Sequence, residues 1–294
     1  MVKKMTRYIV SISGGAGSTL ALERVIAQHG YENTRAIFAD TNTEDESLYD
    51  LIRHIPERHP ELEFIWLNDG RNIWDVFTKS GIIKTPNGAC KASLELKQKP
   101  IVKWVKENCD PDIDVMVSGL EWTEPERRAR FDKRWEPYVC WHPLADAPVL
   151  SNCQIKDDVI DLGYPRQVMY ERRYPHNNCG GGCVLAGQGQ WAGLYADDPE
   201  LFQWHLKEEK EFNDMHREGK KKYSILRDQG KGVVLDDDGN MSMKKKNTPI
   251  MLGEFEQMIL NNTVNLRDFR SACGCFLGEQ TNMFDLLEDD DCSI

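Results

Sequence analysis

Hydrophobic and polar positions change their spacing repeatedly along the first half of the chain. Four short runs rich in apolar and β-branched residues, at 8–12, 35–39, 62–67 and 114–119, predict β-strands. Amphipathic stretches between them predict helices: one ending at Gly30, one opening with a capping box at 43–46 and bounded by Pro56 and Pro60, and two at 72–77 and 94–106. Because strands and helices alternate, we predict a doubly wound, mostly parallel α/β domain over residues 5–165.

The second half of the chain has longer helical periodicity and fewer strand-like runs. Residues 199–217 predict one long amphipathic helix, and residues 233–243 predict a hairpin that turns at DDDGN. Thr248 and Pro249 have the form of an N-cap and a first helical position, which predicts a helix from there to residue 260. We therefore expect a mostly helical, cysteine-containing cap over residues 166–286, followed by an acidic tail at 287–294.

Composition narrows the class of protein. Of 294 residues, 40% are hydrophobic and 29% are charged, with a net charge of −11, which is typical of a folded globular protein and not of a general nucleic-acid coat. No run approaches the ~18 apolar residues of a membrane span, and the first residues do not form a signal peptide, so we expect a cytoplasmic protein without a membrane partner. An anionic substrate then needs a local site of basic groups or backbone amides.

The sequence SGGAGS at 13–18 is a glycine-rich loop between a predicted strand and a predicted helix. Glycines permit a tight turn, and free backbone N–H groups with the start of a helix bind phosphate. The loop is not a Walker motif, because no Lys-Ser/Thr pair follows, and it lacks the third glycine of a dinucleotide fingerprint. A glycine turn without a ligand is the alternative.

The loop resembles the phosphate loop of the N-type ATP pyrophosphatases, the PP-loop or adenine nucleotide α-hydrolase superfamily. Further segments follow the order of its 3′-phosphoadenylylsulfate (PAPS) reductase-like branch: FADT at 38–41, KQKP at 97–100, GLEWTEPERR at 119–128, PVL at 148–150 and IKDDV at 155–159. The resemblance implies a HUP-like fold that binds ATP or a related adenine nucleotide with Mg²⁺. It also implies chemistry at the α-phosphate of ATP or of an adenylylsulfate.

The same resemblance assigns residues. Catalytic residues would be Ser18 and Arg127. Nucleotide-binding residues would be Ser13, Gly14, Gly15, Gly17, Ser18, Asp40, Lys97, Gly119, Glu121 and Arg128.

Two departures from the family pattern bear on turnover. Many pyrophosphatases carry Lys-Asp where this chain has Ala16 and Gly17, and arginine is common where it has Glu121. Downstream arginines at 127–134 would supply positive charge to a phosphate or sulfate, or would form a solvated surface. A regulatory or anti-defence protein that binds a nucleotide without turning it over therefore stays open as an alternative.

Four of the nine cysteines form two close pairs in small-residue surroundings. They are Cys179 and Cys183 in NCGGGC, and Cys273 and Cys275 in ACGCF. Four thiolates suit a [4Fe–4S] cluster or a tetrahedral Zn²⁺, and neither spacing is the usual Cys-x2-Cys of a zinc ribbon. Some PAPS reductase relatives, including adenylylsulfate reductases and DNA-phosphorothioation sulfurtransferases, carry an iron–sulfur cluster, and PAPS reductase-like phage and prophage proteins have a similar late pair. Reduced or redox-active thiols are the alternative.

These patterns favour an enzyme that adenylates an acceptor and releases pyrophosphate, or that handles an adenylylsulfate, in sulfur transfer or reduction. Its partners would be the nucleotide and an unidentified acceptor, a nucleic acid or a small molecule, and a homo-oligomer stays open. A true PAPS or adenylylsulfate reductase is a further alternative. It is disfavoured because the C-terminal Glu-Cys-Gly-(Ile/Leu)-His motif is absent and Cys292 follows three aspartates. The histidines His142, His176 and His205 are scattered without metal-ligand spacing.

Overall fold

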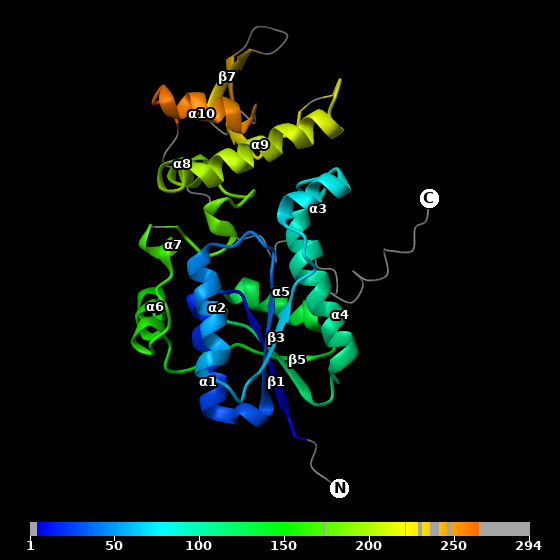
Figure 1. Cartoon of the computed structure of the whole chain (residues 1–294), viewed down its shortest axis with the longest axis vertical. Helices are drawn as coiled ribbons and strands as arrows, with labels where there is room; N and C mark the ends of the chain where they lie inside the picture. Colours follow the sequence, from blue (N-terminus) through cyan, green and yellow to red (C-terminus); the bar gives the residue numbers. More distant parts are fainter. Residues whose placement is uncertain are drawn as a thin grey trace, which may run out of the picture. The chain divides into compact units, whose positions relative to one another are not determined.

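The structure is a computed structural model, and it describes residues 5–172, 174–220, 222–228, 231–235, 241–245 and 248–264. The chain divides into two compact units (Figure 1). The first contains residues up to 76 and 82–180, and the second contains 77–81 and the described residues from 181 onward. The domain bounds at 5–165 and 166–286 stay a prediction.

A five-stranded sheet forms the centre of the first unit. Its strands are β1 (Arg7–Ile12), β2 (Thr34–Ala39), β3 (Glu63–Leu67), β4 (Asp114–Val117) and β5 (Val139–Trp141). The order is β3-β2-β1-β4-β5, and all four neighbouring pairs are parallel. The predicted doubly wound α/β fold is therefore confirmed, with the chain moving outward in both directions from β1.

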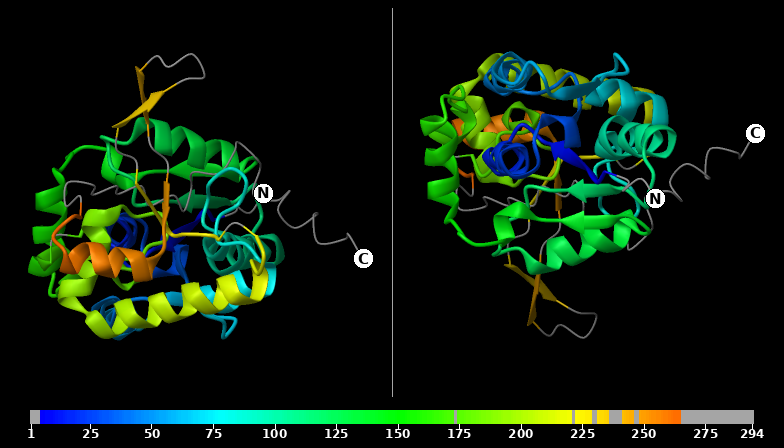
Figure 2. Two further views of the ribbon diagram at one scale, coloured as in Figure 1. Left: turned by 90° about the horizontal axis from the view of Figure 1, so that it is seen from above. Right: turned by 90° about the horizontal axis from the view of Figure 1, so that it is seen from below.

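Helices cover both faces of this sheet (Figure 1, Figure 2). On one face, α1 (Ala16–His29), α2 (Glu46–Arg58) and α6 (Asn152–Asp161) pack with Val10 and Ile12 of β1. On the other face, α4 (Lys99–Asn108) and α5 (Pro125–Trp135) pack with Ile9. Successive residues of a strand point to opposite faces, so a strand buried on both sides is apolar at nearly every position.

Short elements connect these layers. They are η1 (Tyr31–Asn33), the π-helix η2 (Ser93–Gln98), η3 (Pro143–Ala145), α7 (Val168–Glu171), η4 (Cys179–Gly181) and α3 (Ile73–Ser80). Residues of α3 belong to both units. No helix in the described ranges is long and apolar enough to cross a membrane.

The second unit combines helices with two small antiparallel pairs of strands. Its elements are α8 (Gln188–Asp197), α9 (Pro199–His216), β6 (Leu226–Asp228), β7 (Lys231–Leu235), β8 (Met241–Lys245), β9 (Thr248–Ile250) and α10 (Leu252–Leu260). Strands β7 and β8 form the predicted hairpin, and β6 pairs with β9. The predicted turn at 236–240 lies outside the described residues.

Three element predictions were wrong in detail. Thr248 and Pro249 lie in β9, where Pro249 is opposite Arg227, and α10 begins only at Leu252. Proline suits a short edge strand as well as a helix start, and pairing with β6 decides between them. The N-cap of α2 is Asp45, whose carboxylate accepts from the N–H of Ser47 at 2.9 Å, so the capping box at 43–46 does not form.

Pro56 lies inside the last turn of α2 and does not bound the helix. The helix ends at Arg58, so the proline occupies its final turn. Buried Ile55 continues the apolar face up to this turn, and that packing outweighs the missing N–H of proline.

Candidate nucleotide site

The strand order reverses between β1 and β4, and loops from both strands meet there. In open α/β sheets, ligands bind outside the carboxyl ends of the strands at such a reversal. The loop at 13–18 follows β1, and Ser118 and Gly119 follow β4. The topology therefore brings the predicted phosphate loop to the position where this fold class binds its ligands.

Gly17 and Gly119 touch through their backbones, which explains why neither position has a side chain. A Cβ on Gly17 would lie 2.7 Å from the carbonyl oxygen of Gly119, and a Cβ on Gly119 would lie 2.4 Å from the nitrogen of Ser18. Both distances are shorter than real Cβ contacts and involve backbone atoms that cannot rotate away. The two predicted residues thus fix the distance between the β1 and β4 loops.

Gly14 turns the peptide that enters the loop. Its φ of +78° is in the left-handed region, and a side chain there would overlap Leu48. Its carbonyl oxygen accepts from Gln167 Nε2 at 3.0 Å and from Asn177 Nδ2 at 3.3 Å. Because C=O and N–H point in opposite directions across a trans peptide, these two bonds turn the N–H of Gly15 away from the segment that holds Gln167 and Asn177.

Ser18 closes the loop from inside. Its Oγ donates to the carbonyl oxygen of Gly15 at 2.9 Å and accepts from the N–H of Ser13 at 3.1 Å. The hydroxyl of Ser13 is 3.1 Å from the same Oγ and acts as donor there, because the single proton of Ser18 is already used. The structure thus gives the predicted catalytic Ser18, which is 5% exposed, a loop-shaping position.

Helix α1 begins directly after the loop, with Gly15 as an N-cap that has no capping side chain, and its first turn has no acidic residue. The N–H of Ala16 donates to Tyr170 Oη at 3.4 Å. The first N–H groups of a helix have no partner inside the helix, and the helix dipole adds positive potential there. This end of α1 is therefore suited to an anion.

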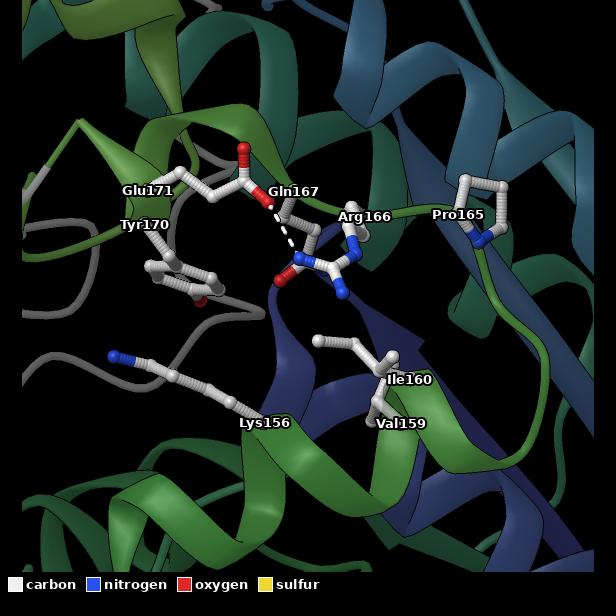
Figure 3. A pocket seen from close by; sticks show the side chains of 8 residues that line it. All are labelled: Lys156, Val159, Ile160, Pro165, Arg166, Gln167, Tyr170 and Glu171. Carbon is white, nitrogen blue, oxygen red and sulfur yellow. Dashed lines mark hydrogen bonds and ion pairs between the residues drawn. The ribbon is translucent and has the colours of Figure 1, made fainter.

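A cavity of about 190 Å³ adjoins the loop (Figure 3). It is lined by Lys156, Val159, Ile160, Pro165, Arg166, Gln167, Tyr170 and Glu171. The hydroxyl of Tyr170 lies 3.4 Å from the N–H of Ala16, and Lys156 Nζ lies 4.3 Å from the centre of the Tyr170 ring. Figure 3 also shows Arg166 bound to Glu171 at 3.2 Å. Helix α6 thereby brings a cation to a tyrosine that contacts the loop, although the loop itself has no lysine.

Asp40 organises the loop after β2. The side chain is buried, and each carboxylate oxygen accepts two hydrogen bonds. The donors are Tyr49 Oη at 2.8 Å, the N–H of Asn42 at 2.8 Å, Asn68 Nδ2 at 3.1 Å and Trp66 Nε1 at 3.2 Å. Burial, and then the hydrogen bond to Asp40, raise the pKa of Tyr49. In this arrangement Asp40 holds the loop in shape.

Lys97 forms an ion pair with Glu44, a residue that the sequence did not single out as functional. Lys97 Nζ lies 2.8 Å from Glu44 Oε1, which also accepts from Thr41 Oγ1 at 3.0 Å. The other carboxylate oxygen accepts from the backbone N–H of Cys179. Glu44 thus connects η2, the β2–α2 loop and the start of η4.

The remaining predicted residues lie at the start of α5. Arg127 bonds to Glu124, the N-cap residue of that helix. Glu121 Oε1 accepts from Asn152 Nδ2 at 2.8 Å, and Arg128 Nη2 donates to the carbonyl of Trp122 at 3.4 Å. These contacts are local to the 121–152 region, so Glu121 and Arg128 stabilise the connection after β4.

A hydrogen-bonded Ser-His-Asp series joins the ends of β4 and β5 to helix α5. Ser118 Oγ lies 2.7 Å from His142 Nδ1, and His142 Nε2 lies 2.8 Å from Asp132 Oδ1. Ser118 precedes Gly119, so this hydrogen-bonded series supports the loop that contacts Gly17. The sequence analysis did not identify this contact. Ser118 comes directly after β4 and His142 directly after the three-residue β5, and parallel strands end at one edge of the sheet, so this rule is the signal that could have found the contact.

The predicted four-cysteine site is only partly within the described residues. Cys179 has a φ of +62° at the end of the first unit, and Cys183 is buried in the second. Cys273 and Cys275 lie outside the described residues. Among the described residues, no group of three or more His, Cys, Asp or Glu side chains is placed to hold a metal ion. The four-thiolate site therefore stays a prediction.

The carboxylates after β2 do not fit a protein-held Mg²⁺. Both oxygens of Asp40 and both oxygens of Glu44 already accept hydrogen bonds from groups of the fold. Protein sites for Mg²⁺ usually supply one or two carboxylates in addition to phosphate oxygens.

Comparisons with known proteins give a similarity of fold. No protein-family model and no curated protein matches the chain. The solved structure of a PAPS reductase from Candida auris in complex with phosphate is similar, with a TM-score of 0.41 and 14% sequence identity. The match covers 59% of this chain and 81% of that one. The fold class follows from the strand order of this chain itself.

Proposed function

We propose that this protein is an adenine-nucleotide-binding enzyme of the PAPS reductase-like kind. It acts at the α-phosphate, either of ATP, where it adenylates an acceptor and releases pyrophosphate, or of an adenylylsulfate, and this chemistry is linked to sulfur transfer or reduction. The observation that carries the proposal is the glycine loop at the strand-order reversal, closed by Ser18 and packed against Gly119. A helix start without an acidic residue in its first turn, placed behind such a loop, binds phosphate through backbone amides.

The chain's own residues have distinct roles in this proposal. The amides of the loop and of α1 hold a phosphate, and Ser18 keeps them in position. Arg127 and Lys97 bind the part of the ligand that leaves, because both cations act electrostatically on His176, whose neighbour Asn177 donates to the carbonyl of Gly14. Arg127 forms an ion pair with Glu124, and Lys97 forms one with Glu44. These carboxylates balance the two positive charges while no anion is bound. Mg²⁺ would enter with the nucleotide, on its phosphate oxygens.

The enzyme proposal is tested by pyrophosphate release from ATP, measured with and without added acceptors. Ser18→Ala removes the hydroxyl that closes the loop, so we expect turnover to fall at least about tenfold, as for loss of one to two hydrogen bonds. Ser80→Ala, a hydroxyl in α3 and in the other compact unit, is the control and should keep turnover unchanged. Equal rates for both variants would contradict a catalytic role of the loop.

A second function is favoured by the chemistry of the loop. Ala16 and Gly17 stand where many pyrophosphatases have Lys-Asp, and Lys97 and Arg127 are both paired with carboxylates. A nucleotide-binding regulatory or anti-defence protein would bind ATP and release no pyrophosphate under any acceptor condition. Sulfite release from an adenylylsulfate would instead identify a true reductase.

The metal centre and the acceptor complete the proposal. Cys179, Cys183, Cys273 and Cys275 would hold a [4Fe–4S] cluster, or Zn²⁺ as the alternative, and four thiolates suit both. The acceptor is a nucleic acid or a small molecule, and the protein acts in the cytoplasm. These statements rest on residue type and spacing.

A further inference from the structure

His176 has an imidazole ring with no hydrogen-bond partner among the described residues. Both Nδ1 and Nε2 are shielded from solvent and unbonded. A buried polar atom without a partner costs free energy, and two on one ring are unusual in a native protein. Such a group points to a ligand that supplies the missing bonds.

The charges around His176 identify the chemistry of that ligand. Burial lowers the pKa of His176, the positive charges of Lys97 and Arg127 lower it further, and Glu44 opposes them. The ring is therefore within electrostatic reach of the two cations that the proposed function assigns to an anion. A neutral imidazole still donates one N–H to an oxyanion.

The neighbours of His176 locate it between the glycine loop and the Glu44–Lys97 pair. Asn177 is completely buried and donates to the carbonyl of Gly14, and Cys179 donates its N–H to Glu44. The Oδ1 atoms of Asn177 and Asn178 also have no partner within the described part of the chain. Three successive residues thus have unbonded polar atoms beside the loop, so the feature is not confined to the ring of His176.

We propose that His176 contacts the substrate, donating a hydrogen bond to the oxyanion attached to the α-phosphate. That oxyanion is the pyrophosphate of ATP or the sulfate of an adenylylsulfate, and Lys97 and Arg127 bind it together with His176. The inference rests on the proposed function and makes it more specific. It separates a loop that holds the α-phosphate from a cationic region that recognises the group beyond it.

The test compares ligands that differ only beyond the α-phosphate. Dissociation constants of the full-length chain for AMP, ATP and adenylylsulfate are measured by titration calorimetry. His176→Phe should weaken the binding of ATP or adenylylsulfate by about tenfold to a hundredfold, which is the effect of one hydrogen bond to a charged group. The dissociation constant for AMP should change by less than about twofold. The ligand whose binding is weakened by the substitution identifies the oxyanion that His176 contacts. His176→Gln, which keeps an N–H donor, should recover part of the loss.

Two controls keep the outcomes distinct. His54→Phe on α2 removes a histidine whose ring meets that of Tyr164 edge to face, and it should change no dissociation constant. If the wild-type chain binds none of AMP, ATP and adenylylsulfate, the proposed function fails and the inference with it. If the wild-type chain binds ATP or adenylylsulfate, and His176→Phe weakens AMP binding as much as binding of the longer ligand or weakens binding of neither longer ligand, only the inference is overturned.

A second measurement does not depend on the folding of a variant. The imidazole ¹⁵N resonances of wild-type protein, assigned by through-bond correlation to the backbone, report directly on the ring. ATP or adenylylsulfate should shift the His176 resonances, and AMP should not. Identical spectra with AMP and with both longer ligands would overturn the contact.

Discussion

The ammonium group of Lys97 lies 2.8 Å from a carboxylate oxygen of Glu44, and the Glu44 side chain is completely buried. The same carboxylate accepts from Thr41 Oγ1 and from the N–H of Cys179, so donors from three segments meet on it. A charge removed from water is tolerated only with such partners. The pair therefore supports the fold around the site in addition to placing Lys97 near His176.

Glu44→Gln should destabilise the protein by about 3 kcal/mol, because it leaves the Lys97 ammonium without its buried counter-charge. Urea unfolding of the full chain measures the change. Glu46→Gln is the matched control on the same segment, since the Glu46 side chain is 74% exposed and its ion pair with Arg53 is worth little. Similar unfolding free energies for the two variants would show that the buried pair does not stabilise this fold.

Gly119→Ala should disrupt the candidate site. The added Cβ would overlap the backbone of Gly17 and Ser18, so the β1 and β4 loops must separate. We expect ATP affinity to fall by more than about tenfold and stability by about 1–3 kcal/mol, the range for overpacking. Binding by calorimetry and unfolding by urea report the two effects.

Gly253→Ala provides the comparison for Gly119→Ala. Gly253 lies in α10, where an added Cβ meets nothing within 4 Å, and alanine is the better helix former. The substitution should leave ATP affinity unchanged and stability equal or higher by up to about 1 kcal/mol. A normal ATP affinity in Gly119→Ala would refute the close approach of the two loops.

Metal content tests the four-cysteine prediction. Anaerobically purified protein should be brown and contain about four irons per chain if the cysteines hold a [4Fe–4S] cluster. Replacement of Cys179 and Cys183 by serine should remove the colour, whereas Cys153→Ser, at an exposed cysteine outside the two pairs, should keep it. Colourless protein with one zinc would indicate a structural site, and protein without either metal would contradict the prediction.

The fold was largely predictable because local patterns encode it. Apolar runs identified the four longer parallel strands, and the glycine loop after β1 identified the edge at which the candidate site lies. Strand β5 has only three residues and no comparable run, so no pattern identified it. Thr248 shows the limit of local signals, because Thr-Pro suits both a helix start and an edge strand.

The contacts that shape the site were not predictable in the same way. Gln167 and Asn177 bind the carbonyl of Gly14 across 153 and 163 residues of sequence, and Lys97 meets Glu44 across 53. No spacing rule covers such distances, since the connections depend on how the segment after α6 returns to the loop. Ser118 and His142 are an intermediate case, because both follow strands whose parallel pairing brings their ends together.

The second unit contains a titratable group that should make stability depend on pH. His205 is completely buried, with its ring centre 5.1 Å from that of Trp191 and 4.7 Å from that of Trp204. A Cβ on Gly182 would lie 2.1 Å from His205 Nε2, so the ring fills the space beside that glycine. Burial lowers the pKa of His205 to about 3, and the ring is neutral in the folded protein.

Acidification should therefore destabilise the protein through His205. In the unfolded chain the ring takes up a proton below a pKa of about 6.5, whereas the folded chain does so only near 3. The unfolded state binds more protons between these values, so stability is retained above pH ~6.5 and falls as the pH drops below it, by about 2 kcal/mol at pH ~5. Urea unfolding at pH ~7 and ~5 should show this loss in the wild type and in His54→Gln, a histidine on α2 that is not fully buried. His205→Gln, which does not titrate, should lack it. An equal loss in wild type and His205→Gln would assign the acid sensitivity to other groups.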